Sequence, residues 1–179
     1  MEKKEYLPVH IRRMITRDLP EVLDIEFESF EYPWLEEDFV RCLKQRNSIS
    51  MVAEKAGKIS ENEQCREEYD RVLGFMIYEL NKHRIALLNL AVHPDYRRRS
   101  VGTQMVNKLI SKLSSEGRRR ITLEVHETNL PAQLFFRNCG FKAINIFHDF
   151  YEDTLEDAYV MNYNYKPQLN PKLEHLTIE

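Results

Sequence analysis

Cysteine is scarce in this chain of 179 residues, which contains only three. Cys42, Cys65 and Cys139 lie far apart and form no C-x-x-C pair. This pattern argues against a disulfide framework and is typical of plain thiols in a reducing compartment, so we expect a cytoplasmic protein. A domain of this size buries about 70% of the surface of its unfolded chain. It therefore needs no metal to fold, and we expect no metal site.

Long hydrophobic runs and an excess of one charge are also absent. The first residues, "MEKKEYLPVHIRRMITRD", contain no apolar stretch typical of a signal peptide. No segment approaches the roughly 20 apolar residues of a membrane span, so we expect no membrane partner. The net charge of -3 argues against nucleic acid as a main partner.

The glycine-rich loops that bind nucleotides are missing as well. Neither G-x-x-x-x-G-K-[ST] nor G-x-G-x-x-G occurs in the chain. Their absence disfavours a nucleoside triphosphatase and a dinucleotide-dependent dehydrogenase.

The chain instead shows an alternation of strand and helix patterns. Hydrophobic periodicity predicts seven strands and four helices. The strands are expected at 9–15, 49–56, 71–80, 84–92, 121–127, 141–151 and 157–165, and the helices at 19–29, 34–46, 101–116 and 129–140. We expect Asp18 to cap the first helix, Gly117 to end the third, and Phe27 and Leu35 to lie on apolar helix faces. This order predicts one α/β domain, residues 1–165, with helices on both faces of a sheet and a tail at 166–179.

A basic turn follows the most apolar of these strands. In "AVHPDYRRRSVGTQMV", residues 91–106, three consecutive arginines stand at the start of a helix. The free N–H groups and positive dipole end of a helix bind anions, so the turn is suited to a pyrophosphate. A solvated basic turn before an amphipathic helix is the alternative.

Two longer stretches resemble a known family. "LLNLAVHPDYRRRSVGTQMV" and "TLEVHETNLPAQLFFRNCGF" are similar to the paired core motifs of the GNAT N-acetyltransferases, whose loop R/Q-x-x-G-x-G/A binds acetyl-CoA. The resemblance covers about residues 9–165. "YPW", "LEVHETN" and "FHDFYEDTLEDAYVM" are most similar to the bacterial ribosomal-protein alanine N-acetyltransferases. The resemblance implies a GNAT fold with a single mixed, mostly antiparallel sheet of about seven strands.

The resemblance also implies a set of residues that bind acetyl-CoA. Those around the pyrophosphate would be Arg97, Arg98, Arg99, Ser100, Val101, Gly102 and Thr103. Those along the pantetheine arm would be Leu90, Ala91, Val92, Asn129, Phe135 and Phe136. Ser100 stands where the family usually has its first glycine, and a positive φ there would strain a serine.

Glu124 is the candidate general base. It lies on the polar face of the alternating strand "ITLEVHE" and matches the glutamate of the family's "LEV" motif. His126 shares that face and is a candidate proton relay, or else a bystander. A backbone N–H near Ala91 would polarise the thioester carbonyl. Phe136 replaces the tyrosine that protonates the leaving thiolate in the related enzymes, and Tyr151 is the substitute that we consider.

The expected reaction is acetyl transfer from acetyl-CoA to an amine. At pH 7 an α-amine is roughly a tenth deprotonated and a lysine less than about a thousandth, which favours a protein N-terminus as acceptor. Acidic residues crowd the expected cleft walls and would attract a basic N-terminus. They are Glu26, Glu28, Glu31, Glu36, Glu37, Asp38, Asp149, Glu152, Asp153, Glu156 and Asp157. The alternatives are a small-molecule amine as acceptor and a non-catalytic acyl-CoA-binding module. We expect a monomer or weak homodimer.

Overall fold

The computed structural model describes residues 5–56, 72–151 and 156–167, apart from the side chain of Tyr151. Its strands are β1 (Val9–Arg13), β2 (Ser48–Lys55), β3 (Val72–Leu80), β4 (Arg84–Val92), β5 (Arg120–His126), β6 (Lys142–Tyr151) and β7 (Glu156–Asn164). Its helices are α1 (Leu19–Ser29), α2 (Glu36–Lys44), α3 (Val101–Ile110) and α4 (Leu130–Asn138), with short 3-10 turns η1 (Thr16–Asp18) and η3 (Pro94–Tyr96). The predicted order of strands and helices is confirmed.

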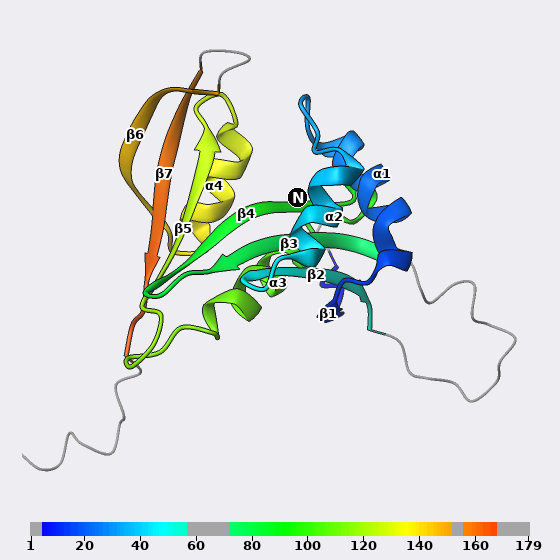
Figure 1. The fold of residues 1–179 in the computed structure, drawn as a ribbon, viewed down its shortest axis with the longest axis horizontal. Helices are drawn as coiled ribbons and strands as arrows, with labels where there is room; N and C mark the ends of the chain where they lie inside the picture. The colour runs from blue at the N-terminus through cyan, green and yellow to red at the C-terminus, as the bar shows by residue number, and fades with distance from the viewer. Residues whose placement is uncertain (1–4, 57–71, 152–155, 168–179) are drawn as a thin grey trace, which may run out of the picture.

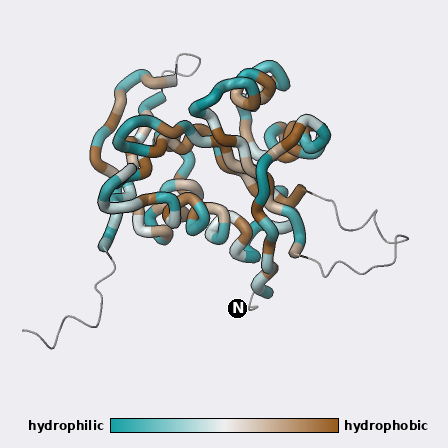
Figure 2. Tube along the Cα trace, turned by 60° about the horizontal axis from the view of Figure 1, so that its bottom comes forward, coloured by the Kyte–Doolittle hydropathy of each residue, from teal (hydrophilic) through white to brown (hydrophobic). Residues whose placement is uncertain are grey.

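The strands form one sheet in the order β1-β2-β3-β4-β5-β7-β6. All neighbours are antiparallel except β4 and β5, which run parallel. The predicted mixed, mostly antiparallel α/β sheet is therefore confirmed. Figure 2 shows hydrophobic residues concentrated in the central strands, while the helices alternate hydrophobic and hydrophilic positions.

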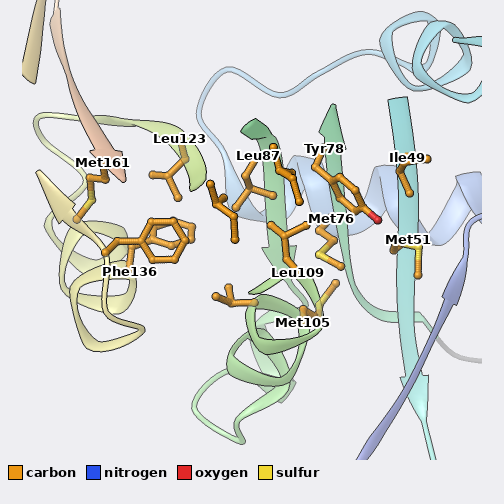
Figure 3. Packing of buried hydrophobic residues seen from close by; sticks show 14 of the residues in the cluster. Ile49, Met51, Met76, Tyr78, Leu87, Met105, Leu109, Leu123, Phe136 and Met161 are labelled. Atoms are coloured by element: carbon orange, nitrogen blue, oxygen red, sulfur yellow. The ribbon is translucent and has the colours of Figure 1, made fainter. Parts of the chain in front are cut away.

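Two hydrophobic cores cover the two faces of the sheet. One contains Met105 and Leu109 of α3 and Phe136 of α4, packed on residues of β2 to β5 and β7 (Figure 3). The other contains Ile25 of α1 and Phe39 of α2, packed on β2, β3 and β4. Helices thus lie on both faces, as the amphipathic patterns predicted.

The parallel pair β4 and β5 separates soon after it begins. Its register contains only Arg84–Ala86 of β4 opposite Arg120–Thr122 of β5, and the two strands diverge from there (Figure 1). The rest of β4 pairs with no described strand on that side, so its backbone N–H and C=O groups need other partners.

A β-bulge lies in β4 at the same place. Ile77 of β3 is opposite Asn89, but the next residue, Tyr78, is opposite Leu87, so Leu88 is unpaired. A bulge shifts the side-chain alternation by one residue. Leu87 therefore packs in the core under α3 and α4, whereas Asn89 lies on the face covered by α1.

Several local predictions are wrong. Asp18 does not cap α1, because its carboxylate binds the Arg12 guanidinium and the Ile15 amide. The helix α3 ends at Ile110, well before Gly117. Phe27 and Leu35 are 56% and 59% exposed. Phe27 lies outside the buried face of α1, and Leu35 is the extended residue before the first residue of α2.

Several expectations fall at least partly on residues outside the described ranges, and among them are the predicted cleft residues Glu152 and Asp153. The polar loop at 57–71 lies there, although its flanking strands β2 and β3 pair as expected. Most of the tail also lies there, and the domain end at 165 stays a prediction next to the end of β7 at Asn164. Cys65 is outside as well, while Cys42 and Cys139 are free thiols whose pKa burial raises. Within the described residues, the helices are too short or too polar to cross a membrane.

Candidate active site

The basic turn between β4 and α3 has the backbone of an anion-binding loop. Arg98 and Ser100 both have a positive φ of 66°. In the described part of the chain, the amides of residues 98–103 have no hydrogen-bond acceptor. Successive N–H groups in such a turn and in a first helical turn converge on one point and bind anions. Arg98 and Arg99 are exposed beside them, and the Arg99 guanidinium lies 5.8 Å from the Tyr96 ring centre.

The N-terminal segment holds this turn in place. The Leu7 amide donates to the Arg99 carbonyl at 3.1 Å. The Gln104 side chain accepts from the Val9 amide at 3.1 Å and donates to the carbonyls of Leu7 and Ser100 at 2.8 and 3.2 Å. Sequence reasoning missed Gln104, because its partners in the N-terminal segment, Leu7 and Val9, lie more than 90 positions away along the chain.

Arg97 is exposed like the two arginines that follow it, but its side chain is also hydrogen-bonded to the protein. Its Nε donates to the Val92 carbonyl at 2.9 Å, and its Nη2 donates to the Ser29 hydroxyl at 2.8 Å. Its amide donates to the Pro94 carbonyl. Arg97 therefore connects the end of β4 to the end of α1, and its predicted contact with the pyrophosphate stays a prediction.

The backbone of β4 offers two residues to a pantetheine arm. The His93 amide donates to the Leu73 carbonyl of β3. Hydrogen bonds alternate along an antiparallel pair, so Ala91 also bonds to β3. Leu90 and Val92 direct their backbone groups to the other side, where β5 has diverged. The free N–H groups nearest the predicted site are thus those of Leu90 and Val92, and the Ala91 amide belongs to the sheet.

Residues of α4 pack against the start of α3. A Cβ added to Gly102 would lie 3.2 Å from the Phe135 ring and 3.5 Å from Val92. A glycine therefore lets the first turn of α3 approach α4 and β4 closely. Phe136 is buried in the core with Phe135 and Phe141, at ring-centre distances of 5.0 and 5.4 Å.

Asn129 is the N-cap of α4, as the sequence predicted. Its Oδ1 accepts from the Ala132 amide at 3.1 Å, which leaves its side-chain NH2 group for a ligand. Its role in binding pantetheine stays a prediction.

Glu124 lies where the two central strands have separated. It is two residues beyond Thr122, the last residue of β5 that pairs with β4. Its neighbours Leu123 and Val125 point into the core under α4, so the half-buried Glu124 side chain projects on the opposite face. Burial raises the pKa of Glu124 above its ordinary value, although the nearby positive charge of Arg84 lowers it in part. A carboxylate with a raised pKa is a stronger base.

His126 follows on the same face of β5. Its Nδ1 lies 2.9 Å from Oε2 of Glu156 on β7. The Glu156 carboxylate therefore places a negative charge beside the His126 ring. Tyr151 is the last residue of β6, opposite Glu156. Its side chain lies outside the described residues, so its predicted role stays a prediction.

The expected acidic walls are only partly at the surface. Glu28, Glu31, Glu36, Glu37 and Asp149 are exposed. The predicted surface role is wrong for Glu26, which is 1% exposed and binds the Trp34 amide and the Asn89 side chain. Asp38 accepts from the Leu35 amide and from Arg41. Asp157 binds His148 and the amide of Asp149.

The geometry of these residues suits acetyl-CoA. The free amides and arginines of residues 98–103 match a pyrophosphate, and the unpaired side of β4 matches an amide-containing arm. No group of three or more metal-ligand side chains occurs in the described residues. A diverging sheet with an anion-binding turn and a half-buried carboxylate defines a transferase that uses an acyl-CoA.

Comparison with known proteins identifies the family. The model of the acetyltransferase (GNAT) family matches residues 19–141. This match covers more than half of the chain, so the protein belongs to the GNAT family and is an acetyl-CoA-dependent N-acetyltransferase. The family predicted from the core motifs is confirmed.

Relatives within the family agree with the finer resemblance. The [ribosomal protein bS18]-alanine N-acetyltransferase of Escherichia coli K12 is 29% identical over 153 residues, which cover 84% of this chain and 94% of that protein. The Salmonella typhimurium protein of the same name is 28% identical over 149 residues, with coverage of 82% and 90%.

Solved structures share the fold. The crystal structure of the E. coli ribosomal-protein-S18-alanine N-acetyltransferase has a TM-score of 0.71 at 24% identity, covering 91% of this chain and 99% of that one. Arabidopsis thaliana NAA60 in complex with acetyl-CoA has a TM-score of 0.73 at 18% identity, covering 88% and 98%.

Proposed function

We propose that the protein acetylates the N-terminal α-amine of a protein, with Glu124 as general base. The position of Glu124 carries this proposal, because its carboxylate projects from β5 where β4 has diverged. The names of the relatives support an N-terminal amine of a ribosomal protein as acceptor. They do not favour a small-molecule amine or a non-catalytic module.

The chemistry that the chain must supply is proton removal and positioning. Acetyl-CoA brings the acetyl group as a thioester. The acceptor nitrogen forms a bond to the acetyl carbonyl carbon, the bond to the CoA sulfur breaks, and Glu124 accepts a proton from the nitrogen, directly or through water. The N–H groups of Leu90 and Val92 polarise the carbonyl oxygen. His126, oriented by Glu156, passes the proton to solvent.

Phe136 cannot protonate the leaving thiolate, because it has no hydroxyl and is buried among other aromatic rings. A thiol titrates near pH 8.5, so a thiolate is a fair leaving group without a dedicated acid. Tyr151 is the candidate for any such acid. If it acts so, Tyr151→Phe lowers the acetylation rate, whereas an unchanged rate rejects this role.

Exposed carboxylates support a basic acceptor. Glu28 and Glu31 lie near the end of α1, Glu36 and Glu37 begin α2, and Asp149 lies near the end of β6. An excess of negative charge raises the local concentration of a positively charged peptide. The cytoplasmic location and the monomeric or weakly dimeric state belong to this proposal and rest on the sequence.

The test is acetyl transfer to synthetic peptides, followed by mass spectrometry. One peptide begins with alanine and has basic residues next, a second begins with alanine and is neutral, and a third has a blocked N-terminus and an internal lysine. We expect one acetyl group on the first peptide, slower transfer to the second and none to the third. Equal rates on the first two would reject the acidic attraction, and transfer to the third alone would reject the α-amine.

A further inference from the structure

Glu26 is a buried carboxylate that the proposed proton transfer does not use. It lies on α1 and is 1% exposed. Its Oε1 accepts from the Trp34 amide at 2.8 Å, and both of its oxygens lie within 3.1 Å of Nδ2 of Asn89. Burial raises the pKa of Glu26, which the bonds from Trp34 and Asn89 lower in part. Burying a carboxylate is costly, so this position calls for an explanation.

The two partners of Glu26 belong to different parts of the site. Trp34 is in the segment between α1 and α2, and its ring packs edge-on against Phe39 of α2 at 5.7 Å. Asn89 is the β4 residue that follows the bulge at Leu88. It also precedes Leu90, whose backbone groups point to the side that β5 has left. The Glu26 carboxylate thus connects the segment between α1 and α2 to β4, the strand that would hold the acetyl group.

We propose that Glu26 is a positioning residue for acetyl transfer, which fixes the segment at residues 30–35 relative to β4 through Trp34 and Asn89. This inference rests on the proposed function. The bulge leaves β4 without a regular pairing partner at Leu88, and beyond Ala86 β4 has no described strand on the β5 side. The Glu26 bonds therefore hold β4 at a point where the sheet holds it weakly. Displacement of reacting groups by about 1 Å is enough to cost 100-fold in rate.

The hydrogen bonds, rather than the charge, perform this role. Among the described residues, Oδ1 of Asn89 is buried without a hydrogen-bond donor. A glutamine at position 26 keeps an oxygen for the Trp34 amide, and once the Asn89 amide turns over, the NH2 group of the glutamine donates to Oδ1 of Asn89. We therefore expect Glu26→Gln to preserve the connection and Glu26→Ala to remove it.

The experiment measures steady-state kinetics on the alanine-initiated basic peptide, together with calorimetric titration of acetyl-CoA. We expect Glu26→Ala to lower kcat/KM for the peptide at least tenfold, while the Kd for acetyl-CoA changes less than twofold. Glu26→Gln should stay within threefold of the wild type in kcat/KM. Asn89→Ala should lose activity like Glu26→Ala, and the double variant should lose little more, because both remove one connection.

Two controls separate positioning from a general loss of stability. Asp24→Ala removes an exposed carboxylate on the same helix that is not among the residues proposed to attract the peptide, and it should leave kcat/KM unchanged. Leu109→Ala opens a cavity in the core on the other face of the sheet. Below its melting temperature it should keep the wild-type kcat/KM. If Glu26→Ala does not fold, the other two variants test the inference: Asn89→Ala should lose activity at least tenfold, and Glu26→Gln should stay within threefold of the wild type.

The other possible results would overturn either this inference or the proposed function. A fully active Glu26→Ala variant, or one no weaker than Leu109→Ala, would overturn the inference and leave the proposed function intact. A Glu26→Gln variant as impaired as Glu26→Ala would show that the charge is required and would overturn positioning by hydrogen bonds. A wild-type protein that acetylates no peptide would overturn the proposed function, and this inference with it.

Discussion

Replacing Ser100 by glycine should stabilise the protein, because Ser100 is held in a left-handed conformation with φ 66° and ψ 9°. This conformation costs a non-glycine residue about 1–2 kcal/mol. A glycine at this position also makes the unfolded chain more flexible, which offsets about 0.4–1 kcal/mol of the stabilisation. The Ser100 side chain makes no capping bond, and its carbonyl, which accepts from Gln104, remains in the variant. We therefore expect a net gain in the free energy of unfolding of about 0.5–1 kcal/mol.

The assay is thermal unfolding followed by circular dichroism, with titration of acetyl-CoA. For a chain of this size about 1 kcal/mol shifts Tm by roughly 2–4 °C, so Ser100→Gly should raise Tm by about 1–4 °C. It should keep the affinity for acetyl-CoA, because the loop amides stay in place. Ser115→Gly is the matched control, since Ser115 is exposed and has no positive φ, and it should lower Tm. If Ser100→Gly lowers Tm as much as Ser115→Gly does, the argument from backbone strain is wrong.

Three further predictions concern the general base Glu124, the glycine of the cofactor turn at Gly102, and the ion pair between Asp18 and Arg12. In wild type, log kcat/KM against pH should have slope 2 below the raised pKa of Glu124 and slope 1 above it, up to the α-amine pKa. Glu124→Gln should lower kcat/KM about 100-fold and leave slope 1 throughout, whereas an unchanged profile rejects Glu124 as the base. Gly102→Leu should weaken acetyl-CoA binding at least tenfold by calorimetry, because its Cβ would contact the Phe135 ring; unchanged affinity would contradict this packing. Burial acts to raise the pKa of Asp18, but its bonds to Arg12 and to a backbone amide lower it overall. The contribution of Asp18 to the free energy of unfolding is therefore fully present above the pKa that Asp18 has in the unfolded chain. It is lost as pH falls through the lower pKa that Asp18 has in the folded protein. Urea unfolding should show that Asp18→Asn has a free energy of unfolding about 1–3 kcal/mol below that of the wild type at pH 7. This difference should be smaller at pH 3, and an equal difference at both pH values would refute the ion-pair argument.

Most of the cofactor turn could be predicted from the sequence. The residues from Arg98 to Thr103 are consecutive, and their amides are free because a helix begins there. Asn129 caps α4 because its oxygen reaches the Ala132 amide three residues on. These features depend on neighbours along the chain. Gln104 and Arg97 were not predictable in the same way, because Gln104 binds the N-terminal segment and Arg97 binds Ser29.

The acceptor side could be predicted much less well. The acidic residues of α1 looked equivalent, yet Glu26 is buried while Glu28 is exposed. Phe27 between them is exposed, although its hydrophobicity predicted the core. Which side of α1 faces the sheet depends on how the helix packs, and only the burial of Val22 and Ile25 reveals it.

The sequence by itself determined the order of the strands and helices and the alternation of β5 that places Glu124 opposite the core. Such patterns arise from local periodicity, which each segment carries alone. Only the tertiary structure decided that β4 bulges at Leu88, separates from β5 after Ala86 and is bound through Asn89 to Glu26. These features depend on hydrogen bonds and packing between segments far apart in the chain, and no local pattern specifies those partners.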